Sequence, residues 1–299
     1  MEHFDPGGRE SYGPKYPVRV EDIQLGELPE NLRTTVVVLA FEGWNDAGDA
    51  ASTAATHIID RFNAEVVGRI DAERFFDFST TRPFVRLTDN GREVEWPDTK
   101  FHFARLPEHD YDLLIILGHE PQLRWRTFAE HVVKVALAYN ATMAVSLGAL
   151  IAEVAHTRPI TVFGTSQHTT VRDRLDLEPS TYEGPTGIVG ILSQALDQAG
   201  LETVSLWGSV PNYAPHAPSP KAALALVERV AQLLELKIPV AVLEVGTQAY
   251  ESQITRLVSN DDDMVNYVSQ LEHEYDAAMK PESADELIQD LEEFLRDQG

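Results

Sequence analysis

The sequence has no cysteine, which excludes disulfide bonds, thiolate metal ligands and catalytic thiols. Long apolar runs are also absent, since no stretch approaches the roughly 18 residues that span a membrane. The first residues, MEHFDPGGRESYGPKYP, contain neither an apolar core nor a basic region of the kind that targeting segments carry. These absences predict a cytoplasmic protein with no membrane partner.

Positive charge is scarce. The chain holds 24 Lys and Arg against 48 Asp and Glu, which gives a formal net charge of −24. A charge of this sign repels phosphate backbones, and no run of basic residues offers a local exception. The composition therefore predicts no nucleic-acid partner.

The familiar cofactor and metal motifs are missing. The sequence has no GxxxxGK[ST] phosphate loop, no GxGxxG after a strand, no HExxH and no calcium-loop pattern. Its ten histidines are scattered without the spacing of metal ligands. We therefore predict no metal and no cofactor, and the sequence favours a protein that is not an enzyme.

What the chain does contain is an apolar strand followed by an unusual turn. Residues 34–41 (TTVVVLAF) show no polar alternation, as is typical of a central strand covered on both faces. The turn FEGWNDAGDAAS then opens a helix over residues 46–62. Asn45 or Asp46 can cap that helix, and its alanines allow close approach to the sheet.

Further strands and amphipathic helices alternate along the body of the chain. Alternation of this kind predicts a three-layer α/β/α sandwich with a mixed, mostly parallel sheet. The predicted strands are residues 66–70, 112–118, 142–147, 160–163 and 202–207, and the predicted helices are residues 125–139, 187–199 and 219–236.

Two segments depart from this alternation. Residues 85–96 alternate around Asn90-Gly91, which predicts an inserted β-hairpin, with residues 100–106 as a third antiparallel strand. From about residue 239 the pattern is helical, and Ser283 with Glu286 forms a capping box. We expect an N-terminal arm over residues 1–30, an α/β/α domain over 31–237 and an acidic helical extension over 238–299. Residues 261–299 hold thirteen acidic and two basic residues, hence a net charge of −11.

The candidate site consists of polar residues in turns that follow strands. Because the carboxyl ends of parallel strands share one sheet edge, these turns can converge there. Two interpretations stay open: the residues form turns and cap helices, or crowded carboxylates serve as acid and base. Ser166 lies in GTSQH, which lacks the last glycine of a nucleophile elbow, so we favour a helix N-cap for it. The candidates are Glu42, Asn45, Asp46, His119, Glu120, Ser166, Glu183, Thr186 and Tyr213.

Several uncommon motifs occur together in order, and with them the chain resembles the actinobacterial branch of the proteasome assembly chaperone family. The resemblance covers roughly residues 31–237. The motifs are FEGWNDAGDAAS, Asp77-Phe78 with Arg82-Pro83, Glu95-Trp96-Pro97, GHEP followed by Trp125, SLGAL, His156-Thr157-Arg158-Pro159 and the PNY turn at 211–213.

This resemblance implies a phosphorylase/hydrolase-like α/β/α core, a helical C-terminal extension and a tendency to form homo-oligomers, a trimer among them. Eukaryotic and archaeal relatives act as chaperones for proteasome α-subunits, which implies a protein partner. Several relatives end in a hydrophobic-Tyr-any tripeptide, whereas this sequence ends in Asp297-Gln298-Gly299. We therefore expect no docking by that route.

Two functions follow as hypotheses. The first is a non-catalytic, oligomeric assembly or scaffolding protein that acts through protein interfaces. The second is a small-molecule-binding protein or a hydrolase/phosphorylase-like enzyme that uses the acidic cluster at the sheet edge.

Overall fold

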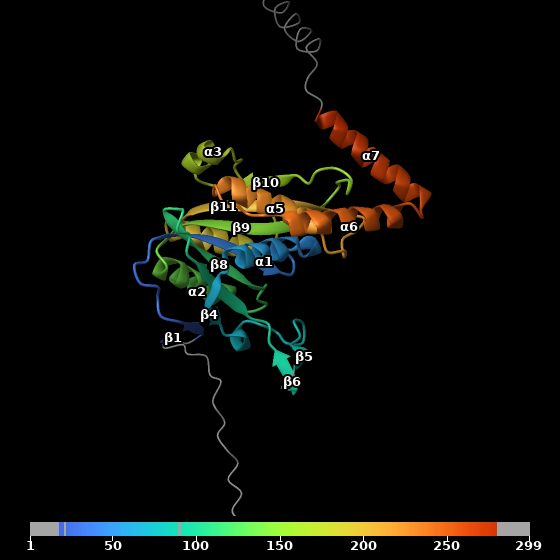
Figure 1. Cartoon of the computed structure of the whole chain (residues 1–299). Coiled ribbons are helices and arrows are strands. Elements are labelled where there is room, and N and C mark those ends of the chain that lie inside the picture. The colour runs from blue at the N-terminus through green and yellow to red at the C-terminus, as the bar shows by residue number, and fades with distance from the viewer. Residues whose placement is uncertain (1–17, 21, 89–90, 280–299) are drawn as a thin grey trace, which may run out of the picture.

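A nine-stranded sheet forms the centre of the molecule (Figure 1). The structure, a computed structural model, describes residues 18–20, 22–88 and 91–279. Within them the strand order is β1-β2-β4-β7-β8-β3-β9-β11-β10. The strands are β1 (Val18–Val20), β2 (Ile23–Leu25), β3 (Thr34–Glu42), β4 (Glu65–Ile70), β7 (Thr99–Ala104), β8 (Tyr111–His119), β9 (Ala141–Ala152), β10 (Val162–Thr165) and β11 (Glu202–Pro211).

The sheet is mixed, with a parallel centre. Strands β8, β3, β9 and β11 pair in parallel, and β1 and β4 run in the same direction as these four. Strands β2, β7 and β10 run the opposite way. The predicted mixed, mostly parallel sheet is confirmed, and β3 has the central position expected of it.

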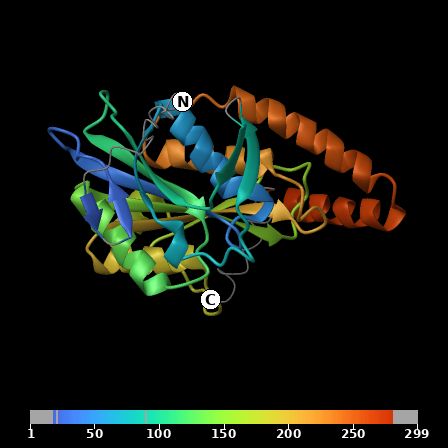
Figure 2. The ribbon, with the colours of Figure 1, turned by 90° about the horizontal axis from the view of Figure 1, so that it is seen from below.

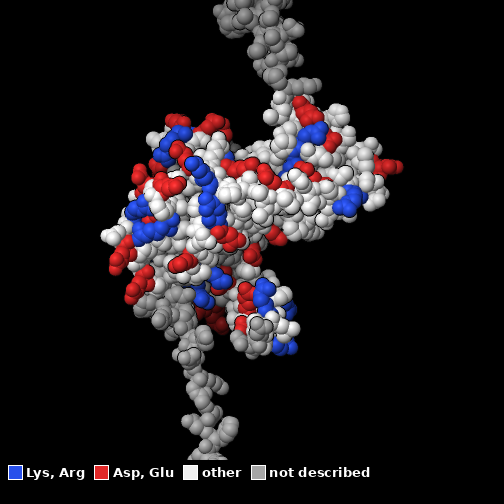
Figure 3. Space-filling model, viewed as in Figure 1, with Lys and Arg blue, Asp and Glu red and all other residues white. Residues whose placement is uncertain are grey.

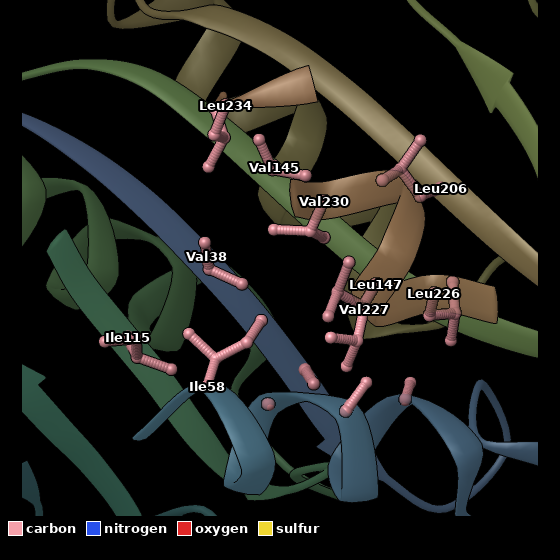
Figure 4. Close-up of a cluster of buried hydrophobic side chains, with 14 of the residues drawn as sticks. Val38, Ile58, Ile115, Val145, Leu147, Leu206, Leu226, Val227, Val230 and Leu234 are labelled. Carbon is pink, nitrogen blue, oxygen red and sulfur yellow. The ribbon is translucent and has the colours of Figure 1, made fainter. Parts of the chain in front are cut away.

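Helices cover both faces of this sheet. On one face lie α1 (Ala50–Phe62), the short α3 (Thr169–Leu175) and α5 (Pro220–Leu233), which share a buried core with the strands (Figure 4). On the other face, α2 (Trp125–Ala138) and α4 (Ile188–Gln198) lie side by side (Figure 2). The three-layer α/β/α fold is therefore confirmed.

The apolar run of β3 serves both cores. Val36 and Val38 point toward α1 and α5, whereas Val37 and Phe41 point toward α2 and α4. Successive side chains of a strand point to opposite faces, so a strand with helices on both sides must be apolar throughout. This is the physical reason for the uninterrupted TTVVVLAF sequence.

The predicted hairpin forms, but it stands apart from the main sheet. Strands β5 (Phe84–Thr88) and β6 (Gly91–Glu95) make a separate two-stranded sheet that protrudes from the body and carries both signs of charge (Figure 3). The sequence predicted that residues 100–106 extend this hairpin, and this prediction is wrong. Strand β7 instead inserts between β4 and β8 of the main sheet. Its Phe101 and Phe103 are buried in the core under α2, and this burial explains the difference.

Helices α6 (Ala241–Val258) and α7 (Asp262–Ala278) follow the sandwich, and α7 projects away from it (Figure 1). A small cluster of buried side chains, including Tyr250, Ile254 and Leu271, joins these helices to Ala155. The helical character expected after residue 239 is confirmed as far as Ala278. The predicted capping box of Ser283 and Glu286, the end of the chain and most of the predicted arm lie outside the described residues.

Short helical turns complete the fold, namely η1 (Ala47–Asp49), which leads into α1, and η2 (Ala72–Arg74), which follows β4. In the part of the chain that the structure describes, no helix combines the length and the apolar character needed to cross a membrane.

Candidate functional site

A cavity of about 1250 Å³ extends from the carboxyl ends of β3 and β9 along β10 and β11. One wall is the turn after β3, residues 43–49, and another is α4 with the segment 184–187 that precedes it. The floor is formed by β10 and β11. The lining includes Trp44, Asn45, Asp46, Asp49, Leu150, Ile151, Phe163, Ser166, Tyr182, Thr186, Gln194, Asp197, Ser205, Trp207 and His216.

The floor follows from strand geometry. Ser205 and Trp207 lie two residues apart on β11 and therefore point to the same face. Phe163 and Thr165 of β10 stand opposite them in the antiparallel register. Gly148 of β9 leaves room for the indole, because a Cβ there would lie 2.5 Å from Trp207 ring carbons.

Asp46 caps the first helix. Its Oδ1 accepts hydrogen bonds from the backbone N–H groups of Ala51 at 2.6 Å and of Ser52 at 3.3 Å. The residue is only 4% exposed. Burial raises the pKa of the Asp46 carboxyl to about 6, although the hydrogen bonds from Ser52 and Ala51 act in the opposite direction. Asp46 therefore accepts from the first turn of α1, as predicted, although the helix begins at Ala50 rather than at Asp46 and Asp49 occupies its N-cap position.

Asn45 and Glu120 anchor the start of α4. Glu120 Oε1 accepts hydrogen bonds from Asn45 Nδ2 at 3.0 Å and from the backbone N–H of Ile188, the first residue of α4, at 2.8 Å. A carboxylate at this position satisfies an otherwise free helical donor and interacts favourably with the helix dipole. The side chain of Asn45 lies so close to Gly187 that a Cβ there would be 2.2 Å from Asn45 Nδ2.

Glu42 and His119 form an ion pair at the ends of β3 and β8. His119 Nε2 lies 2.8 Å from Glu42 Oε2, and the parallel register places the two residues directly opposite each other. The hydrogen bond to Glu42 raises the pKa of His119, with burial opposing it. The ring of His119 also meets Phe76 edge to face.

The structure brings most of the candidate residues together, in two connected groups. Asn45, Asp46 and Thr186 line the cavity near the turn after β3. Ser166 lines the far end of the cavity, beside Thr203 at the start of β11, because β10 runs antiparallel to β11 and not parallel to it as predicted. The second group lies behind the turn and comprises the Glu42–His119 pair and Glu120, with Glu120 joined to the cavity wall through Asn45.

Two candidates do not join this arrangement. Glu183 is exposed and is not among the residues that line the cavity. Tyr213 hydrogen-bonds instead to His156, whose backbone N–H donates to the Tyr213 hydroxyl at 2.7 Å. The sequence predicts strands that end at Leu147 and Trp207. In the structure the first of these, β9, continues to Ala152, and the second, β11, continues to Pro211. These longer strands carry Tyr213 toward α6 and α7.

The hydroxyl group of Ser166 makes two hydrogen bonds to the backbone of nearby segments. Its hydroxyl donates to the carbonyl of Thr203 at 2.7 Å and accepts from the N–H of His168 at 3.2 Å. The predicted N-cap at Ser166 is wrong, because α3 begins at Thr169 and His168 occupies the cap position. The serine instead stabilises the turn that leads into the helix.

Sequence reasoning missed the aromatic side chains of the cavity. Trp44 is 65% exposed, Tyr182 67% and Phe163 52%, although all three are large and apolar. Trp44 could have been noticed, since it lies among polar turn residues rather than in an apolar stripe. Asp197 of α4 was also missed; its Oδ1 lies 2.6 Å from His168 Nε2.

The charge of the cavity limits what it can bind. Its charged lining residues are Asp46, Asp49 and Asp197, and among the described residues that line it there is no Lys or Arg. A phosphate group would find no Lys or Arg there to pair with its charge. The arrangement suits neutral or positively charged groups.

Comparison with solved structures places the chain among related proteins. It is 41% identical to a PAC2 family protein from Streptomyces avermitilis (TM-score 0.73) and 39% identical to a proteasome-assembly chaperone homologue from Mycobacterium tuberculosis (TM-score 0.71). Each match covers 78% of this chain and 99% of the other. An archaeal proteasome activator from Pyrococcus furiosus, 17% identical over 79% of this chain and 97% of its own, shares the fold (TM-score 0.65).

No match is found among proteins with curated descriptions. The family model described as "PAC2 family", in contrast, matches residues 40–258. This match extends from the strand β3 through the cavity-forming segments to the end of α6. With that extent of agreement, and with relatives about two-fifths identical, the chain belongs to the PAC2 family.

Proposed function

We propose that the chain is a non-catalytic, homo-oligomeric assembly or scaffolding protein that acts through protein interfaces. The observation that carries the proposal is the set of exposed aromatic side chains that line the cavity. Trp44, Tyr182 and Phe163 are each more than half exposed around one concave surface. Exposed aromatic side chains that gather in this way are typical of protein-binding surfaces.

The chemistry of the candidate residues supports a role without catalysis. Asp46 caps α1, Glu120 anchors α4, and the hydroxyl of Ser166 is engaged by Thr203 and His168. A nucleophile requires an adjacent general base, and the hydroxyl of Ser166 instead donates its proton to a backbone carbonyl. The named relative from Mycobacterium tuberculosis, a proteasome-assembly chaperone homologue, is consistent with an assembly role.

The experiment is affinity capture from native lysate followed by native mass spectrometry of the purified complex. We expect the protein to be recovered as a homo-oligomer with at least one protein partner at defined stoichiometry. A Trp44→Ala variant should lose the partner, whereas Trp96→Ala, which removes a half-exposed indole beside the hairpin, should retain it. A stoichiometric metabolite without any protein partner would refute the proposal.

One observation favours a second function, a small-molecule-binding protein or a hydrolase-like enzyme. Asp46 borders the cavity, and its pKa of about 6 lies where a carboxyl can exchange a proton near neutral pH. A metabolite screen by thermal shift would test this function. A ligand that stabilises the wild type by several degrees and not the Asp46→Asn variant would support it, and a screen without such a ligand would argue against it.

A further inference from the structure

The cavity combines negative charge with aromatic surface. Asp49 is exposed at its rim and Asp197 is partly exposed on α4. Of the two, Asp197 has His168 as a neighbour, and the exposed His216 also lines the cavity. No Lys or Arg is found among the described lining residues. The negative charges of Asp49 and Asp197 are therefore not both neutralised within the cavity.

The aromatic rings add a second attraction for cations. The face of an indole or phenol ring attracts ammonium and guanidinium groups, and Trp is the strongest of the aromatic side chains in this respect. Trp44 and Tyr182 stand at the rim, while Trp207 and Phe163 form the floor. Long basic side chains suit such a site, because their apolar stems pack on rings while their charged ends reach carboxylates.

The size of the cavity argues for a polypeptide rather than a small amine. Its volume of about 1250 Å³ exceeds the roughly 300–1,000 Å³ of sites for single small molecules. The apolar side chains of Leu150 and Ile151 extend the lining beyond the charged positions. An extended segment with both apolar and basic side chains would use all of these surfaces.

The charge of the whole chain favours the same partner. A net charge of −24 attracts basic segments over distances comparable to the Debye length and accelerates their encounter. We propose that the cavity binds an extended segment of a partner protein that carries Lys or Arg, with its basic side chains packed on the aromatic rings and directed to the carboxylates of Asp49 and Asp197. This inference rests on the proposed function and names the chemistry of the partner.

The test is selection of random peptides of about seven residues, displayed on phage, against the purified full-length protein at low salt. We expect the selected peptides to contain Lys or Arg several times more often than the starting library. Synthetic copies should bind with an affinity that falls as salt rises. A selection without basic enrichment, or one that yields no binders, overturns the inference.

Charge variants locate the binding site. The double variant Asp49→Asn with Asp197→Asn should weaken the selected peptides about five-fold or more, in line with two solvent-exposed charge pairs. The matched control replaces Asp60 and Asp263, two exposed carboxylates that do not line the cavity, by Asn. Equal binding by the two double variants would place the peptides elsewhere and contradict the inference.

An aromatic variant and a small cation complete the test. Trp44→Ala should abolish most peptide binding, whereas Trp44→Phe should retain part of it, because a smaller ring still presents a π face. Spermidine that binds more tightly than any selected peptide would indicate a small-amine site and overturn the inference. If the peptides fail while a captured partner still depends on Trp44, the proposed function stands and only the basic segment is refuted.

Discussion

At the scale of single residues, several polar side chains in this fold complete the starts of helices. Asp46 caps α1 and Glu120 accepts from the first N–H of α4. Ser219 caps α5, since its hydroxyl accepts from Ala222 N–H at 3.3 Å, and Pro220 is the first residue of the helix. These roles explain why unusual polar turns follow the strands.

The Asp46 cap leads to the first prediction. Asp46→Ala removes the acceptor of two backbone N–H groups, and we expect the free energy of unfolding to fall by about 1 kcal/mol at pH 4, where the carboxyl is mostly protonated. Urea denaturation followed by circular dichroism measures this change. An unchanged midpoint would show that water replaces the cap without loss.

The pKa of Asp46 predicts a dependence on pH. The folded pKa of about 6 lies above the ordinary aspartate value of 3.8, so the folded state holds the proton more tightly. Stability from this group is therefore present below about pH 4 and is lost as the pH rises to about 6, with a magnitude of about 3 kcal/mol. Asp46→Asn cannot ionise, so its stability relative to the wild type should rise across this window. Parallel pH curves for the two proteins would contradict the assignment.

At the scale of elements, close contacts determine how α4 meets the turn after β3. Gly187 precedes α4 directly, and the amide of Asn45 occupies the space that a Cβ would need. Glu120 then holds both the amide and the helix. One wall of the cavity therefore depends on a glycine, an asparagine and a glutamate from three separate segments.

Gly187→Ala should disrupt this junction. The new methyl group would force Asn45 away from Glu120, and we expect a loss of about 1–3 kcal/mol in the free energy of unfolding. Removing the asparagine side chain as well, in Asn45→Ala with Gly187→Ala, should make the additional cost of the alanine at 187 small. Additive losses in this double-mutant cycle would show that the two positions are not in conflict.

The segment His156-Thr157-Arg158-Pro159, called the HTRP motif below, connects secondary-structure elements. Arg158 Nε and Nη2 donate to the two carboxylate oxygens of Asp276 at 2.7 and 2.8 Å, and Thr157 hydrogen-bonds to Glu272. His156 Nε2 lies 2.9 Å from Thr255 Oγ1 of α6. The motif thus fastens both C-terminal helices to the sandwich.

Arg158→Ala should loosen α7 without unfolding the core. We expect faster amide hydrogen exchange over residues 262–278 and unchanged exchange over 34–42, because the ion pairs lie at the surface and contribute roughly 1 kcal/mol or less to global stability. Arg86→Ala, which removes an exposed ion pair of the hairpin, is the matched control. If amide exchange in α7 were the same in both variants, Arg158 would not be what holds this helix to the sandwich.

At the scale of the whole molecule, the excess of acids sets the response to salt. A net charge of −24 makes the compact state repel itself, and added salt screens this repulsion. We expect the Tm to rise between about 20 and 500 mM NaCl, with the gain largest below 150 mM where the Debye length changes most. Thermal denaturation by circular dichroism measures the effect. A falling Tm would mean that ion pairs such as Arg33 with Asp112 outweigh the repulsion.

Local patterns in the sequence determined most of the secondary structure. The apolar run of β3, the helical periodicity of α4 and the Asn-Gly signal of the hairpin each depend on neighbouring residues, so they could be recognised without the fold. The pattern of strands and helices also determined the three layers, because each apolar face must be covered.

Only the tertiary structure decided which distant residues meet. The pairing of β7 with β4 and β8, the contact of Glu120 with Ile188 and the departure of Tyr213 toward α7 all depend on strand order and register. The cavity arises because α4, β10 and the turn after β3 leave space between them. Such spaces are products of packing between segments far apart in sequence, and local periodicity carries no information about them.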